Sequence, residues 1–168
     1  MKRNYNVMRI VRGTTVDGPG FRTSIYLAGC RHRCPGCHNP STWDGNAGEV
    51  MSLDEILDVV EAEGYDVTLT GGDPLCHPEA TAVLASAIHR LGFGVWVYTG
   101  YTWEEISASP ALYAAVADVD AIVDGKYVER LRDPDLLFRG SSNQRILALT
   151  HSHDGSVTAM PWHDPYAV

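Results

Sequence analysis

Strand-like and helix-like patterns alternate along the chain from residue 21 to about residue 125. Between the apolar strand patterns lie segments in which the apolar residues fall on one face of a helix, and Ser52 and Glu55 have the spacing of a capping box. The expected strands are residues 21–29, 66–73, 93–101 and 120–128. The expected helices are residues 52–64 and 78–92 and a region after Thr102 that is broken near Pro110. This alternation predicts an α/β domain with a largely parallel sheet.

The end of the chain has a different pattern. Residues 145–162 contain two alternating segments around Asp154-Gly155, which is typical of a hairpin. Residues 163–168 fit disorder equally well. We therefore divide the chain into a domain at 1–150 and a C-terminal extension at 151–168.

Composition excludes some classes of function. The chain has 168 residues, of which 45% are hydrophobic, enough for one domain with a sizeable core. Its net charge of -8 argues against a partner that is a nucleic acid or an anionic membrane. No segment is long and apolar enough to span a bilayer, so we expect a soluble cytoplasmic protein. In that reducing compartment, clustered cysteines are more often ligands or redox groups than disulfides.

Unusual residues stand at or near the ends of the expected strands. Because the carboxyl ends of parallel strands share one edge, and ligands bind at that edge, we expect these residues to converge on one site. They are Cys30, Gly71, Gly72, Thr99, Gly100, Asp124, Gly125 and Lys126.

Three of the four cysteines fall within eight residues, in the stretch CRHRCPGCHNP. Thiolates are soft, anionic ligands, and the bend at Pro35-Gly36 would let Cys30, Cys34 and Cys37 reach three corners of one iron–sulfur cubane. Three protein ligands on a four-iron cluster leave one iron open to a substrate or cofactor.

Other readings of these cysteines stay open at this point. A structural zinc site needs a fourth ligand, but its usual two separated ligand pairs are absent. That fourth ligand could be His32, His38 or Cys76. A dithiol redox site would use Cys34 and Cys37 and would leave Cys30 unexplained. Incidental burial is disfavoured by the basic residues at 31–33. For Cys76 we expect an isolated buried thiol, since a fourth thiolate would close the open iron.

Several blocks of the sequence resemble a known family. TVDGPGFR, GCRHRCPGCHNPSTWD and GGDPL resemble the radical S-adenosylmethionine (SAM) enzymes, and more narrowly the activating enzymes of glycyl-radical proteins. WVYTGY, VDGKY and DPDLLFRGSSNQRI, in this order, resemble the activating proteins of anaerobic ribonucleoside-triphosphate reductases. The blocks cover roughly residues 5–147.

The resemblance implies a fold and cofactors. The fold would be a partial (β/α) barrel of the radical SAM type. Cys30, Cys34 and Cys37 would bind three irons of a [4Fe-4S] cluster, and the fourth iron would chelate the amino and carboxylate groups of S-adenosyl-L-methionine. Gly71 and Gly72 would allow close backbone approach, and Asp73 would attract the cofactor's ammonium group.

Other site residues follow less directly from the resemblance. Asp124 and Lys126 resemble a strand-end Asp-x-Lys that touches the cofactor, although an exposed ion pair is the simpler reading. Many relatives carry an aromatic residue before the third cysteine, where it lies against the adenine; here Gly36 stands there, so His38 would take over part of that contact. Neither RGSSNQ nor the GPGFR block is assigned a task by its chemistry.

The implied activity is reductive cleavage of SAM to place a glycyl radical on the anaerobic ribonucleoside-triphosphate reductase, with an external one-electron donor such as a flavodoxin or ferredoxin. Such chemistry needs no general base, which agrees with the lack of a convincing Ser/His/Asp constellation. The alternatives are an activase of another glycyl-radical enzyme, of the pyruvate formate-lyase type, and a zinc-binding interaction module.

Overall fold

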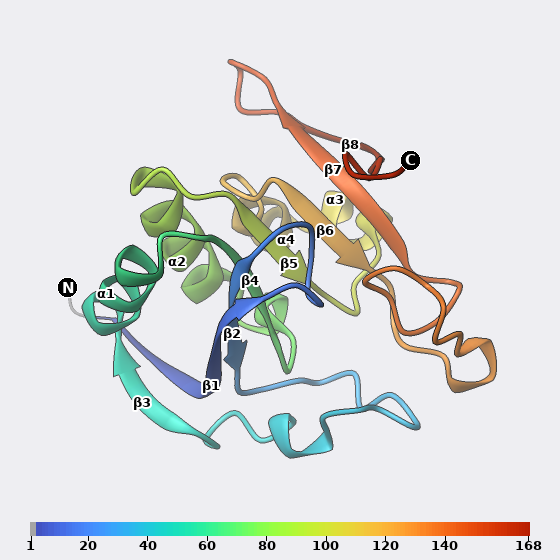
Figure 1. The fold of residues 1–168 in the computed structure, drawn as a ribbon, viewed down its shortest axis with the longest axis horizontal. Helices are drawn as coiled ribbons and strands as arrows, with labels where there is room; N and C mark the ends of the chain where they lie inside the picture. The colour runs from blue at the N-terminus through green and yellow to red at the C-terminus, as the bar shows by residue number, and fades with distance from the viewer. Residues whose placement is uncertain (1–2) are drawn as a thin grey trace.

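The computed structural model describes residues 3–168, which form one mixed sheet with helices packed on it (Figure 1). The strand order is β3-β1-β2-β4-β5-β6-β7-β8. The strands are β1 (Asn4–Thr14), β2 (Arg22–Leu27), β3 (Glu49–Ser52), β4 (Asp66–Gly71), β5 (Val95–Tyr98), β6 (Ala121–Asp124), β7 (Arg145–His151) and β8 (Val157–Pro161). The central pairs β2–β4, β4–β5 and β5–β6 are parallel, and the outer pairs are antiparallel. The predicted α/β class is confirmed, with its parallel part at the centre of the sheet.

Helix α1 begins where the sequence predicts a cap. The helices are α1 (Leu53–Glu63), α2 (Pro78–Arg90), α3 (Trp103–Ala108) and α4 (Pro110–Ala115), with single 3-10 turns η1 (Pro40–Thr42), η2 (Pro74–Cys76) and η3 (Glu129–Leu131). The Ser52 hydroxyl accepts from the Glu55 N–H and the Glu55 carboxylate accepts from the Ser52 N–H, which completes the predicted capping box of α1. Pro110 begins α4 directly after α3, so the predicted break is confirmed.

The core lies between the helices and one face of the sheet. Helix α2 packs against α1 and α4, and α4 packs against α3, which makes one helical layer. Because strand residues alternate in direction, Val95 and Val97 join this core while Trp96 points to the opposite face. There Trp96 packs with Phe138 and Trp162 from the C-terminal part of the chain.

The strands β1 and β3 lie outside the expected pattern, whereas a hairpin at the end of the chain was expected. β1 pairs antiparallel with both β2 and β3, so the N-terminal segment forms a flank of the sheet. At the other end, β7 and β8 form an antiparallel hairpin, visible as the orange-red extension in Figure 1. The expected boundary at residue 150 falls inside β7, and the division of the chain there stays a prediction.

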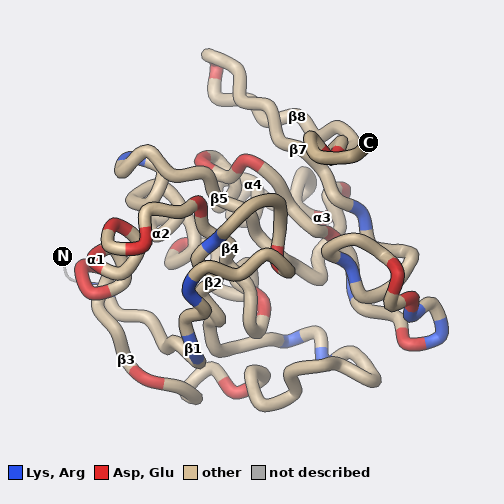
Figure 2. Tube along the Cα trace, in the orientation of Figure 1, with Lys and Arg blue, Asp and Glu red and all other residues tan. Residues whose placement is uncertain are grey.

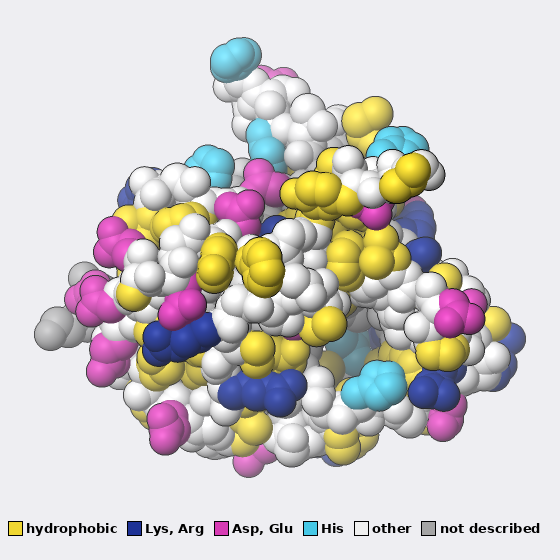
Figure 3. All heavy atoms as spheres, viewed as in Figure 1, with side chains coloured by type: hydrophobic (Ala, Val, Ile, Leu, Met, Phe, Trp, Pro, Cys, Tyr) yellow, Lys and Arg dark blue, Asp and Glu magenta, His cyan; other side chains and the backbone are white. Residues whose placement is uncertain are grey.

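The surface carries dispersed charge. Figure 2 shows Asp and Glu at intervals along α1 and in several loops, while Lys and Arg are spread over separate segments. Figure 3 shows that this face is hollowed beside the loops on the right, with His side chains in and next to the hollow. Within residues 3–168, no helix has the length and apolar character needed to cross a membrane.

Candidate functional site

The three clustered cysteines lie on the loop that follows β2. The Gly29 N–H donates to the Thr42 carbonyl at 2.6 Å, and this bond holds the start of the loop to the turn η1. Further along, the Cys37 N–H donates to the Cys34 carbonyl at 3.1 Å, which closes the bend predicted at Pro35-Gly36. Cys30, Cys34 and Cys37 are all half-buried and line one cavity of about 280 Å³.

The end of β4 supplies the facing wall of this cavity through Gly71, Gly72 and Asp73. A Cβ atom on Gly72 would lie 2.3 Å from the Gly29 carbonyl oxygen, and one on Gly71 would lie 2.5 Å from the Leu27 backbone. The Asp73 N–H in turn donates to the Gly29 carbonyl at 2.8 Å. The two glycines therefore let β4 pass directly against the start of the cysteine loop.

Asp73 is the most heavily bonded side chain of the site. It is 2% exposed, and its carboxylate accepts from the Leu75 N–H at 2.8 Å, the Thr99 hydroxyl at 3.0 Å and the Gly100 N–H at 2.9 Å. The Nε2 atom of His32 lies 2.6 Å from the same carboxylate, and this bond raises the pKa of His32. Asp73 thus ties the cysteine loop to the ends of β4 and β5. Its predicted attraction for an ammonium group stays a prediction.

Of the two residues predicted at the end of β6, Asp124 and Lys126, only Lys126 faces the cavity. Lys126 lines it together with Gly125, whereas Asp124 is not among the lining residues. Asp124 is 1% exposed and accepts from the Trp103 N–H at 2.8 Å and from Arg145 Nε at 3.0 Å. Asp124 therefore does form an ion pair, as the simpler reading of the sequence held. Its carboxylate, however, is buried, whereas that reading assumed an exposed pair.

Of the two residues predicted near the adenine, His38 and Gly36, only His38 lines the cavity. His38 lines the cavity beside Tyr127, with ring centroids 5.2 Å apart. Gly36 is outside the lining; it has φ 76°, and a Cβ there would lie 2.7 Å from Glu129 Cδ. Gly36 thus shapes the turn of the cysteine loop against η3, and its contact with a cofactor stays a prediction.

The RGSSNQ segment holds the Lys126 wall in place. Gln144 Nε2 donates to the Gly125 carbonyl at 3.0 Å, and Asn143 Nδ2 donates to the Lys126 carbonyl at 2.8 Å. The Gln144 side-chain oxygen accepts from the N–H groups of Gly140 and Ser141. The sequence alone assigned no role to Asn143 and Gln144, because the carbonyls to which they donate lie on a separate segment.

The GPGFR block lies beside β4, between two residues that line the cavity, Asp17 and Tyr26. The Arg22 guanidinium is 3% exposed and donates to the Thr68 hydroxyl at 2.8 Å and the Val67 carbonyl at 2.9 Å. Its own burial lowers the pKa of Arg22. Two lining residues that the sequence did not indicate meet here, where the Tyr26 hydroxyl donates to Asp17 at 2.8 Å.

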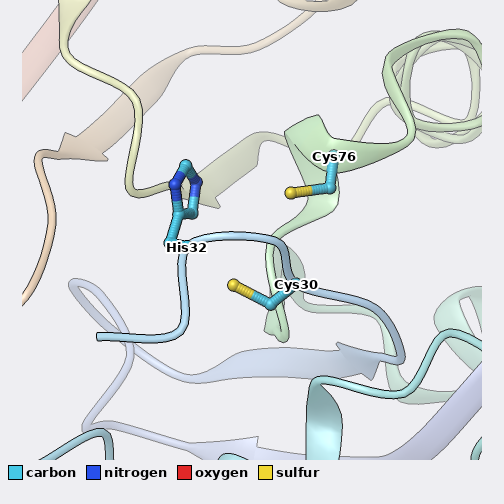
Figure 4. A group of neighbouring side chains, drawn as sticks. All are labelled: Cys30, His32 and Cys76. Atoms are coloured by element: carbon cyan, nitrogen blue, oxygen red, sulfur yellow. The ribbon is translucent and has the colours of Figure 1, made fainter. Parts of the chain in front are cut away.

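Cys76 lies directly behind the cysteine loop. It is 3% exposed, it is outside the cavity lining, and its sulfur lies within 4.8 Å of the Cys30 sulfur and of a His32 ring nitrogen. Figure 4 shows the three side chains projecting into one small space, Cys30 and His32 from the loop and Cys76 from η2. A hydrogen bond with Cys76 lowers the pKa of Cys30 to about 6, and the same bond raises the pKa of Cys76. Cys76 is therefore buried as expected, but the expectation that it is isolated is wrong.

The donor set fits an iron–sulfur cluster. Three thiols line one cavity, and the fourth, that of Cys76, is not among its lining residues, so the chain offers three thiol ligands there. The opposite wall presents backbone at Gly71 and Gly72, where side chains would clash with neighbouring backbone. This cavity has room beside the thiols for a further ligand.

Comparisons with known proteins give a consistent result. A protein-family model described as "4Fe-4S single cluster domain" matches residues 16–147. An "Anaerobic ribonucleoside-triphosphate reductase-activating protein" from Escherichia coli (strain K12) is 39% identical over 142 residues, covering 78% of this chain and 90% of that protein. A protein of the same description from Enterobacteria phage T4 is 35% identical over 156 residues, covering 88% of this chain and 95% of that protein. Among solved structures, QueE from Escherichia coli aligns with a TM-score of 0.48 and 22% identity, over 59% of this chain and 54% of that one.

Proposed function

Because this chain belongs to the family of the anaerobic ribonucleoside-triphosphate reductase-activating proteins, we propose that it activates such a reductase by radical chemistry on S-adenosyl-L-methionine. Cys30, Cys34 and Cys37 would hold a [4Fe-4S] cluster. When bound, the cluster would supply the single electron for reductive cleavage of SAM, and the resulting radical chemistry would be directed at a glycine of the reductase. The electron would come from a flavodoxin or ferredoxin.

One observation carries this proposal. The three thiols and the glycine edge of β4 come from segments far apart in the sequence and line the same cavity. A structural metal site has no need of an adjoining cavity, whereas a cluster with an open iron needs space for the cofactor beside it.

The walls of the cavity suit the parts of SAM. Lys126 brings a cation that would pair with the methionine carboxylate. The rings of His38 and Tyr127 offer apolar faces against which the adenine would stack. Asp17, held by Tyr26, places an acceptor at the far wall where the ribose hydroxyls would donate.

The chain's own contribution is positioning. The hydrogen bonds from Asn143 and Gln144 fix the backbone on both sides of Lys126, so its side chain starts from a defined place at the cavity wall. Asp73 fixes the opposite wall through its contacts with the ends of β4 and β5. Such preorganisation holds SAM still while water is excluded, which is how a small domain directs a reactive radical.

The direct test is anaerobic iron and sulfide analysis of the reconstituted chain, followed by reduction with SAM and assay for 5′-deoxyadenosine. We expect about four irons per chain. We also expect Cys30→Ala to abolish both iron binding and cleavage, because it removes a ligand. Cys76→Ser is the matched control; it should load iron normally under strict anaerobiosis, since Cys76 lies outside the cavity.

A different result would favour the interaction-module alternative. Stoichiometric zinc after anaerobic purification, with no SAM cleavage after iron reconstitution, would contradict the proposal. A positive result would lead to the second assay, in which the loaded chain is incubated with the anaerobic reductase and the glycyl radical is measured by electron paramagnetic resonance.

A further inference from the structure

Cys76 has no part in the proposed radical chemistry, yet it lies beside one of the three thiols that do. Its sulfur and that of Cys30 are within 4.8 Å of each other, and both side chains project into the space drawn in Figure 4. Cys30 is reached from the cavity on one side, while Cys76 covers it on the other and is itself 3% exposed. The pair therefore consists of one thiol that is accessible from the cavity and one that is buried.

The backbone keeps these two thiols together. The Arg31 N–H donates to Cys76 Sγ at 3.5 Å, and Arg31 Nη2 donates to the Cys76 carbonyl at 3.3 Å. The Asp73 N–H bond to the Gly29 carbonyl fixes the residue before Cys30 to the N-cap residue of η2. The residues on both sides of Cys30 are thus anchored to Cys76 and to the start of its 3-10 turn.

We propose that Cys30 and Cys76 form an intramolecular disulfide when the chain lacks its cluster, and that this bond keeps Cys30 from binding iron until a thiol reductant opens it. A disulfide needs the sulfurs to approach to about 2.05 Å, so the two side chains must move together from their present separation of no more than 4.8 Å. Bond formation itself requires no cluster. The consequence for iron binding rests on the function proposed above.

The chemistry balances with a small disulfide such as oxidised glutathione as the oxidant. The Cys30 thiolate attacks it, and one glutathione thiol leaves. The Cys76 thiolate then attacks the Cys30 sulfur of the mixed disulfide, and the second glutathione thiol leaves. Both cysteine sulfurs are oxidised, two electrons and two protons pass to glutathione, and the buried Cys76 needs no access to solvent because its attack is intramolecular.

Cys34 and Cys37 form the rival pair. They are two residues apart in a Cys-x-x-Cys arrangement, and both line the cavity. Within residues 3–168, however, neither of them shares the compact group formed by Cys30, His32 and Cys76. The two pairings give different cross-linked peptides, so one experiment separates them.

The test uses the full chain freed of iron by a chelator under anaerobic conditions, then treated with oxidised glutathione and digested without reduction. We expect a peptide in which Cys30 is linked to Cys76, in the wild type and in the Cys34→Ser control. Cys76→Ser and Cys76→Ala should lack it and should carry glutathione on Cys30 instead. Circular dichroism on each variant verifies that it is folded.

A second readout concerns iron. The oxidised wild-type chain should bind iron and sulfide only after treatment with a thiol reductant, while untreated cluster-free wild type binds them directly. A Cys34–Cys37 link as the main product, or four free thiols in the folded wild type, would overturn the disulfide. If the Cys30–Cys76 link forms but the fully reduced chain never binds iron, the disulfide stands and the proposed function fails.

Discussion

At the scale of single residues, the site depends on positions where a side chain is either absent or fully engaged. Gly72 has no room for a Cβ because the Gly29 carbonyl is too close. The Asp73 carboxylate accepts hydrogen bonds from other groups of the protein. Both residues come directly after β4 and both touch the cysteine loop. A substitution at either position should therefore displace the cysteine thiols more than it displaces the residues of the hydrophobic core.

We expect Gly72→Ala to lower the stability of the cluster-free chain by about 1–3 kcal/mol, because the new methyl group must push the Gly29 backbone away. The same shift displaces Cys30, so iron bound per chain after reconstitution should fall by more than half. Thermal unfolding and iron analysis measure the two effects.

Gly92→Ala is the matched control for this substitution. Gly92 has φ 91° with nothing within 4 Å of a Cβ, so alanine should cost about 1 kcal/mol of backbone strain and leave iron binding unchanged. Equal iron loss in both variants would mean that lowered stability, and not the position of the cysteine loop, controls cluster assembly.

At the scale of elements, Arg145 at the start of β7 connects the end of β6 to the start of α3. It donates two bonds to the buried Asp124 and two to the exposed Glu104, and Asp124 also accepts from the Trp103 N–H at the first residue of α3. The bond from Arg145 lowers the pKa of Glu104 to about 2. This junction stands directly before Gly125 and Lys126, so it sets the direction in which they leave β6.

We expect Arg145→Met to destabilise the chain by about 3 kcal/mol, because it leaves the Asp124 carboxylate buried without its cation. Denaturant unfolding at neutral pH measures the loss. Glu104→Gln removes only the exposed partner and should change stability little.

The sign of the pH effect follows from the lowered pKa. A carboxylate whose folded pKa is depressed stabilises the fold above its unfolded value and loses that contribution as the pH falls through the folded value. For Glu104 this range lies below about 4.3, the ordinary pKa of a glutamate, so the difference between wild type and Glu104→Gln should be the same at pH 7 and pH 6. A difference that changed between those values would point to another group.

At the scale of the whole molecule, the C-terminal hairpin is part of the fold although most of it lies beyond the family match at 16–147. Val157 is buried in the main core and bonds through its backbone to the Tyr113 hydroxyl. Trp162 packs against Trp96 and Phe138 on the opposite face of the sheet. One short segment therefore contributes to both hydrophobic clusters.

We expect a chain that ends after Ser152 to lose about 3 kcal/mol or more of stability, because Val157 and Trp162 no longer bury their apolar surface. A chain that ends after Asp164 keeps both residues and should match the wild type. Urea unfolding of both truncated chains measures the difference. Equal stabilities would show that β8 only rests on the sheet.

Much of the fold could be predicted from local patterns. A few neighbouring residues are enough to specify the helix starts at Ser52 and Thr102 and the strands β2, β4, β5 and β6. The alternation of elements was therefore predicted correctly. β1 and β3 were missed because an antiparallel flank is specified by its pairing with distant residues and not by a local period.

By itself, the sequence determined the α/β class, the three thiols of the cavity and the family, since these depend on residue types at short spacings. Only the tertiary structure decided where side chains point at the strand ends. It turned Asp124 toward Arg145 while leaving Lys126 at the cavity, and it placed Cys76 behind Cys30. The physical reason is that β6 ends at Asp124 and the chain turns at Gly125, which has φ 94°, so the alternation of the strand does not set the direction of Lys126. Partners from distant segments, such as Arg145 and Cys76, meet only when the chain has folded.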